Sequence, residues 1–61
     1  MNINRASKEE LTGLAGIGEK TADAIIRYRS RHGAFQTIEE LRHVGNLFEQ
    51  HVSYLREKVS V

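Results

Sequence analysis

Apolar residues recur at helical spacing in two stretches of the chain. The first stretch carries Ala22, Ile25 and Ile26, with Arg29 at the next position of the same face, and the second carries Phe48, Val52, Leu55 and Val59. Residues three and four apart lie on one face of a helix, so each stretch predicts an amphipathic helix whose apolar face packs inward. No alternating strand pattern competes, and the absence of proline leaves both helices uninterrupted. The pattern therefore predicts an all-α fold with these positions in the core.

Capping signals give the helix boundaries. Each half of the chain opens with a serine or threonine followed three residues later by glutamate, the pattern of a capping box at a helix start. The first helix is expected over residues 7–14. A second helix is expected to begin near Gly18 or Glu19 and to end at about His32, with Gly33 as its C-cap. The two capping boxes are Ser7 with Glu10 and Thr37 with Glu40.

The chain also repeats itself. Shifting the sequence by thirty positions brings the two capping boxes into register and aligns the later apolar residues. Two copies of one helix pair are the simplest explanation, so we expect a single domain over residues 1–61, with units at about 7–32 and 37–60. Phe35 lies between the units without periodicity, and we expect it to fill the space between the two helix pairs. The aligned pairs are Leu14 with Val44, Ile17 with Leu47, Ala22 with Val52, and Ile25 with Leu55.

Length and composition exclude several classes of protein. A chain of 61 residues holds one compact domain at most, and its 39% hydrophobic and 28% charged content is ordinary for a globular protein. With no cysteine, disulfides and thiolate zinc sites are excluded. No apolar run approaches the roughly 20 residues that span a bilayer, and residues 1–5 lack the apolar stretch of a signal peptide. Because the net charge is only +1, a polyanion would have to be recognised by local geometry.

A glycine turn, residues 14–18, joins the two helices of the first unit. Gly16 and Gly18 permit backbone angles or a close approach that a side chain would prevent, and Ile17 between them can turn inward. The next residues begin a helix whose first amides have no partner within it and face outward at the positive end of the helix dipole. This arrangement predicts an anion site suited to phosphate. The alternative is a tight turn that binds nothing.

Residues 11–22, with Ile25–Ile26, Tyr28–Arg29 and residues 33–35, resemble the helix-hairpin-helix family. Residues 2–7 and the tandem layout are similar to the domain of bacterial competence DNA receptors of the ComEA type. The resemblance implies a compact all-α domain of four to five helices, with two units related by a pseudo-twofold axis. It also implies sequence-independent binding of double-stranded DNA by phosphate contacts across the minor groove, with DNA uptake, DNA repair or another process left open. By motif position, the DNA-binding residues would be Gly16, Ile17, Gly18, Glu19, Lys20 and Thr21.

Some members of the family hold a monovalent cation, K⁺ or Na⁺, at the hairpin carbonyls, where it bridges to a phosphate. The corresponding oxygens here belong to Thr12, Leu14 and Ile17. Ala15 stands where the family usually has proline, which leaves the turn less rigid in the unfolded chain but removes no group that would touch DNA. No other cofactor, no small-molecule substrate and no membrane contact is expected.

The second hairpin departs from the first. Asn46 and Phe48 replace its two glycines, and Gln50 and His51 stand where the first unit has lysine and threonine. A bulky Phe48 at the point of closest approach should block a phosphate, although Gly45–Asn46 still supports a turn. We therefore expect a functional first hairpin and a second one that mainly supplies packing.

Three basic residues, Lys20, Arg27 and Arg31, are spaced seven and four positions apart, which places them on one helical face beside the first hairpin. We expect this face to follow the DNA backbone, with Arg5 and Lys8 nearby. The alternative is a solvated helix face without a ligand.

Other polar residues suggest structural roles. Arg29 shares the apolar face of its helix, where its long stem is expected to pack while its charge reaches the surface. The three histidines lack metal-ligand spacing, so we expect no zinc or iron site and place them on the surface or at helix ends. These histidines are His32, His43 and His51.

Two other functions remain open. Residues 16–22 also resemble the hairpin of DNA glycosylase-lyases, in which a lysine at the position of Lys20 attacks the sugar. Those enzymes need a pocket for an extruded base and a separate aspartate, and too little chain remains to build them, so no enzymatic activity is expected. A protein-docking module of a larger assembly also fits the near-neutral charge. A competence receptor would lie on the extracytoplasmic face of a bacterial membrane or in the periplasm, and any other role would be cytoplasmic.

Overall fold

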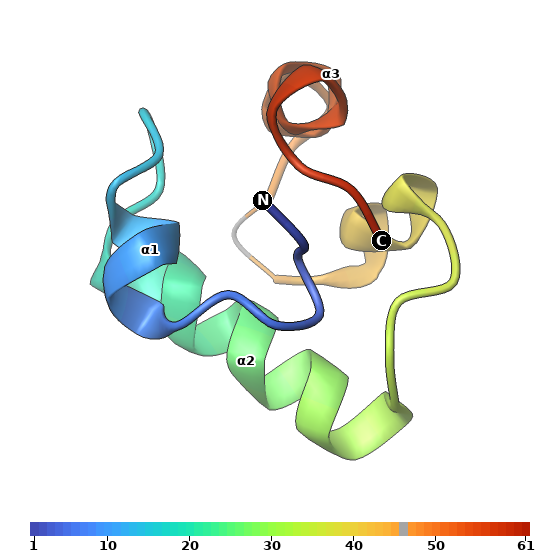
Figure 1. Ribbon diagram of the computed structural model, residues 1–61. Coiled ribbons are helices and arrows are strands. Elements are labelled where there is room, and N and C mark those ends of the chain that lie inside the picture. The colour runs from blue at the N-terminus through green and yellow to red at the C-terminus, as the bar shows by residue number, and fades with distance from the viewer. Residues whose placement is uncertain (46) are drawn as a thin grey trace.

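The computed structural model describes residues 1–45 and 47–61, which contain four helices in the order α1, α2, η1 and α3 (Figure 1). Within these residues the only strand-like pairing is an isolated bridge, so the predicted all-α fold is confirmed. No helix in this part of the chain is long and apolar enough to cross a membrane. The α-helices are α1 (Lys8–Thr12), α2 (Glu19–His32) and α3 (Glu49–Lys58), and η1 (Ile38–His43) is a 3₁₀ helix.

Helix α1 begins as predicted and ends early. The Ser7 hydroxyl accepts a hydrogen bond from the Glu10 amide at 3.1 Å, and the Glu10 carboxylate accepts one from the Ser7 amide at 2.9 Å. The predicted end at Leu14 is wrong, because the helix stops at Thr12. There the Leu14 amide donates to the Leu11 carbonyl at 3.1 Å, a three-residue spacing that tightens the last turn and leads the chain out of the helix.

The second unit opens differently, and its predicted capping box is wrong. The Thr37 hydroxyl caps no amide, and the Glu40 carboxylate accepts from the Gln36 amide at 2.8 Å instead. The Glu40 amide donates to the Thr37 carbonyl at 3.2 Å, the short spacing of a 3₁₀ helix. The first helix of this unit is therefore η1 and not a second copy of α1.

Helix α2 has the predicted bounds. Gly18 is its N-cap, and Gly33 is its C-cap with a φ of 86°, a conformation that favours glycine. On its inner face Ile25 is fully buried. Arg29 packs along the same face, and its guanidinium donates to the carbonyl of Ile3 at 2.8 Å, as expected for a residue with a buried stem and a polar end.

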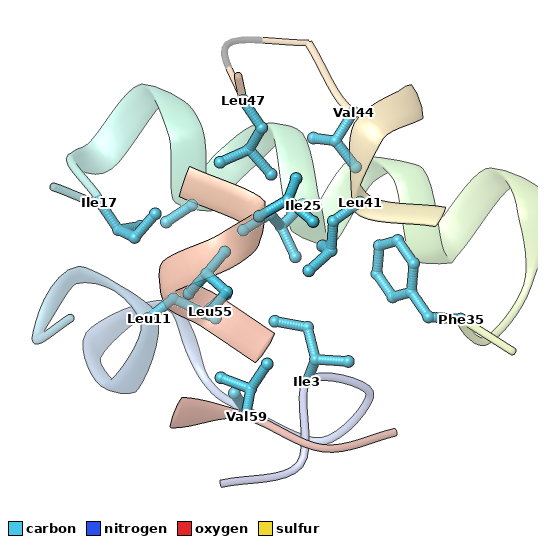
Figure 2. Packing of buried hydrophobic residues seen from close by; sticks show 13 residues of the cluster. Ile3, Leu11, Ile17, Ile25, Phe35, Leu41, Val44, Leu47, Leu55 and Val59 are labelled. Atoms are coloured by element: carbon cyan, nitrogen blue, oxygen red, sulfur yellow. The ribbon is translucent and has the colours of Figure 1, made fainter. Parts of the chain in front are cut away.

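One apolar core holds both helix pairs together. Helix α1 packs against α2, and η1 packs against α3. Figure 2 shows side chains from both units and from the N-terminal segment converging on this core. Because both pairs share it, the two hairpins are held in a fixed relation. The buried side chains among the described residues are Ile3, Ala6, Leu11, Ile17, Ala22, Ile25, Phe35, Leu41, Val44, Leu47, Val52, Leu55 and Val59.

Phe35 fills the space between the helix pairs, as predicted. Only 2% of its surface is exposed, and its ring stacks on Tyr28 with centroids 5.0 Å apart. The Asn4 side chain holds the same residue from the other side: its amide oxygen accepts from the Phe35 amide at 2.7 Å, and its nitrogen donates to the Phe35 carbonyl at 3.1 Å. The N-terminal segment is therefore part of the fold, through long-range contacts that no sequence pattern indicates.

The expectation that Phe48 belongs to the inward face of the last helix is wrong. Its side chain is 68% exposed, whereas Val52 and Leu55 are fully buried. The reason is that Phe48 precedes α3 as its N-cap, with an extended backbone at φ −111° and ψ 170°. Helical spacing does not apply to a residue outside the helix.

Candidate nucleic-acid interface

The first hairpin is the tight turn between α1 and α2. Gly16 has a φ of 81°, a left-handed conformation that is strained for any residue with a side chain. The Ile17 amide then donates to the Leu14 carbonyl at 3.1 Å. The turn directs Ile17 into the core, where only 4% of it is exposed, as the sequence predicted. Gly16 is thus required by the backbone of the turn.

Gly18 differs from Gly16, because nothing in the fold requires it to be glycine. Its backbone is extended, with φ −92° and ψ −177°, which any residue can adopt. A β-carbon added to Gly18 would meet no described atom within 4 Å. The effect of glycine at this position is to leave the surface in front of the turn open.

Four backbone amides open α2, and they have no acceptor among the described residues. The first amide of this region that donates within the chain is that of Ala22, which is 2.9 Å from the Gly18 carbonyl. Unpaired amides at a helix start carry the positive end of the helix dipole, and together they form a site for an anion. These amides belong to Gly18, Glu19, Lys20 and Thr21.

In the second hairpin, hydrogen bonds within the chain occupy part of the corresponding set of amides. The Phe48 amide donates to Nδ1 of His51 at 3.2 Å, and the His51 amide donates to the Phe48 carbonyl at 2.9 Å. Two of the four amides that would correspond to the open set in the first hairpin are therefore in use. The expectation that Gly45–Asn46 forms a turn falls in part on Asn46, which lies outside the described residues.

His51 lies at the junction of the two hairpins. A β-carbon added to Gly16 would be 3.6 Å from Cδ2 of His51, so the imidazole lies against the first turn. Its Nδ1 meanwhile accepts from the Phe48 amide. His32 and His43 are exposed at the ends of α2 and η1, as expected, but His51 is half-buried and joins the start of α3 to the first hairpin.

The predicted basic residues line a continuous exposed strip on α2. Lys20 and Arg27 border a hollow of about 250 Å³, which is also lined by Asp23, the partner of Lys8. Arg27 and Arg31 border a second hollow of about 300 Å³, whose lining also includes Val44 and Gly45 of the second hairpin. Within the described part of the chain, none of the three forms an ion pair. The strip therefore keeps its positive charge and runs from the first hairpin towards the second.

Lys8 lies beside the first hairpin as expected, but it is engaged by carboxylates. Its Nζ is 3.2 Å from both Glu19 and Asp23. Hydrogen bonds to Asp23 and then to Glu19 raise the pKa of Lys8 above its ordinary value. The pairing partly neutralises the two carboxylates of the first turns of α2, next to the open amides. Two other basic residues are paired in the second unit, Arg42 with Glu49 and Arg56 with Glu39.

The predicted cation ligands belong to the same turn and to the end of α1. The Leu14 carbonyl already accepts from Ile17, while the carbonyls of Thr12 and Ile17 have no backbone donor among the described residues. Backbone oxygens of this kind suit a hard monovalent ion. A cation held by these three carbonyls stays a prediction. No group of three or more histidine, cysteine or acidic side chains in the described residues is arranged to hold a metal ion.

Two helix pairs on one core, each with a hairpin between its helices, define a helix-hairpin-helix domain. A family model described as "Helix-hairpin-helix motif" matches residues 1–60, and the chain belongs to this family. The family predicted from the sequence is thereby confirmed.

Among its relatives is the ComE operon protein 1 of Bacillus subtilis, which is 41% identical over the whole chain. The endonuclease/exonuclease/phosphatase family domain-containing protein 1 of Danio rerio is 39% identical over the whole chain. A DNA ligase of Bacillus subtilis is 43% identical over 72% of the chain. The chain spans 30% of the first of these proteins, 11% of the second and 7% of the third.

Proposed function

We propose that this domain binds double-stranded DNA without sequence preference, by hydrogen bonds from the amides of the first hairpin to phosphate oxygens across the minor groove. The observation that carries the proposal is the environment of Gly18. Its backbone and surroundings would accept a side chain, and the absence of one leaves the unpaired amides of α2 open to a ligand.

Phosphate is the ligand that fits this opening. Amides at a helix start favour an anion, and the unpaired strip of Lys20, Arg27 and Arg31 continues from them over the surface of α2. A repeating polyanion would contact both the amides and the basic strip, whereas a single anion would contact only the amides. Phosphate contacts carry no base information, so duplexes of different sequence are expected to bind equally.

The relatives support a role within a longer protein that handles DNA. One relative is named as a product of the ComE operon and another as a DNA ligase, and the chain spans less than a third of either. We propose that the domain holds DNA for such a protein, with DNA uptake as the process. We assign no catalytic step to the domain itself, and its cellular location follows that of the protein that carries it.

A charge change at Gly18 tests the proposal. Aspartate at an N-cap accepts from the next amides and stabilises a helix, so Gly18→Asp is expected to leave the thermal stability equal or slightly higher. It should at the same time place a negative charge where the phosphate binds and lower the affinity for duplex DNA at least tenfold. Thermal unfolding should therefore show no loss of stability, while fluorescence anisotropy shows a clear loss of affinity.

The matched control is Thr37→Asp, which adds the same charge at the N-cap of η1, beyond the opposite end of α2 (Figure 1). Its affinity should stay within about twofold of the wild type, since exposed charges more than about 10 Å apart are largely screened at ordinary salt. Unchanged affinity in Gly18→Asp, or an equal loss in both variants, would count against recognition at the hairpin.

An NMR titration with a short duplex separates DNA binding from protein docking. Amide shifts should cluster at residues 16–22 and extend to Arg27 and Arg31. No shift with any duplex would favour the docking alternative. Borohydride trapping on a duplex with an abasic site addresses the lyase alternative: an adduct lost in Lys20→Ala would contradict the absence of catalysis.

A further inference from the structure

Phe48 is the most exposed large apolar side chain among the described residues, with 68% of its surface open to solvent. It stands at the start of α3, at the position that the repeat aligns with Gly18. An exposed ring forgoes the gain of burial, so packing of the domain gives no reason for an aromatic residue at this point.

The ring lies beside His51, which in turn contacts the first hairpin. Nδ1 of His51 accepts from the Phe48 amide at 3.2 Å, and the two rings lie 5.9 Å apart. The same imidazole lies against Gly16, with Cδ2 3.6 Å from the position of an added β-carbon. A ligand that covers the open turn therefore has the flat face of Phe48 within reach on the neighbouring hairpin.

We propose that Phe48 stacks on a nucleobase at an interruption of a DNA duplex, so that the domain prefers gapped DNA to intact DNA. This inference rests on the proposed DNA binding. Stacking on an aromatic ring accepts any base, because every base offers a π-face, and it therefore suits a domain without sequence preference.

The cost of opening the stack decides between intact and gapped DNA. To insert the ring into an intact base step, the domain would have to unstack the two base pairs. Non-specific binding, with a dissociation constant of about 10⁻⁴ to 10⁻⁶ M, provides little free energy for this. A gap exposes a base face without this cost. The adjacent Glu49 carboxylate is held by Arg42 at 2.7 Å, which reduces its repulsion of a DNA strand near the ring.

The test compares an intact duplex with the same duplex lacking one nucleotide. The wild-type domain is expected to bind the gapped duplex about tenfold more tightly, within the range of one base-to-ring stack. Phe48→Ala should bring the ratio of the two affinities to about one. Phe48→Leu, which keeps an apolar side chain without a flat face, should lose most of the preference, and Phe48→Trp should keep it. Circular dichroism checks that each variant is folded.

Because the chain contains no tryptophan, the Phe48→Trp variant carries a single fluorophore at the proposed contact. Its emission should be quenched on gapped DNA and much less on intact DNA. Equal wild-type affinities for the two duplexes would overturn the stacking and leave the proposed function intact. Binding to neither duplex would overturn both the stacking and the proposed function. A preference kept in Phe48→Leu, or a dimer of the wild type that Phe48→Ala abolishes, would assign the side chain to apolar docking and overturn the proposal.

Discussion

The two hairpins of this domain have a similar backbone conformation at their last residue, but the surfaces that they present differ. Gly18 and Phe48 both cap a helix with an extended backbone, at φ −92° and φ −111°. Gly18 leaves open space and unpaired amides, whereas Phe48 carries a bulky ring and donates its amide to His51. The folded backbone therefore accepts either residue, and the choice between them determines what the hairpin can bind.

The difference teaches how to separate structural from functional glycines. Gly16 has a φ of 81° and is explained by the turn that it makes. Gly18 has no such explanation in the fold, because Phe48 occupies the corresponding position in an almost identical conformation. A glycine that the fold does not need indicates a close approach by something else.

The largest effect is expected when the first hairpin is made like the second. Gly18→Phe should lower the affinity for intact duplex DNA roughly 30- to 100-fold, the loss expected for about two amide hydrogen bonds at about 1 to 1.4 kcal/mol each. Its unfolding free energy should fall by about 1 kcal/mol or less, since the position is open and only the preference for glycine at an N-cap is lost. Anisotropy and thermal unfolding measure the two quantities. A variant that still binds would mean that the amides are not the contact.

A gain of binding is expected when the second hairpin is made like the first. Phe48→Gly combined with His51→Thr removes both the ring and the side chain that accepts from the amide of residue 48. The affinity for intact duplex should rise severalfold, because about one further amide-to-phosphate bond becomes available. Phe48→Gly alone should give less, since His51 still occupies that amide. NMR shifts on addition of the intact duplex should appear at residues 48–51 only in the double variant.

The basic strip predicts a smaller effect that salt reveals. With two or three phosphates engaged, log affinity should fall against log salt with a slope of roughly −2 to −3. Arg27→Gln or Arg31→Gln should each reduce this slope by about one. Arg56→Gln is the matched control, because Arg56 is paired with Glu39 in the second unit. An equal change of slope in the control would mean that net charge and not the strip governs binding.

Much of the first unit was predictable from sequence because its signals are local. The capping box of Ser7, the C-cap at Gly33 and the inward position of Ile17 depend on residues at most four apart, and each is confirmed. The exposed Phe48 and the 3₁₀ helix η1 were not predictable from the repeat. Aligned residues share a position in the repeat, but they do not contact the same neighbours in the fold.

Long-range contacts account for the rest. The two hydrogen bonds between Asn4 and Phe35 span 31 residues, and no periodic pattern in the sequence predicts them. The contact of His51 with the turn at Gly16 depends on how the two helix pairs dock on their common core. Neither the partner nor the direction of such side chains follows from spacing along one helix.

The smallest expected effect compares the two helix starts and concerns stability alone. Ser7→Ala removes a cap and should lower the unfolding free energy by about 1 kcal/mol, which corresponds to roughly 4–8 °C in melting temperature for a domain of this size. Thr37→Ala should change it by less than about 0.5 kcal/mol, because the Thr37 hydroxyl caps no amide. Equal losses in thermal unfolding would show that the second capping box forms after all. Neither variant should alter DNA affinity, since neither hydroxyl belongs to the first hairpin.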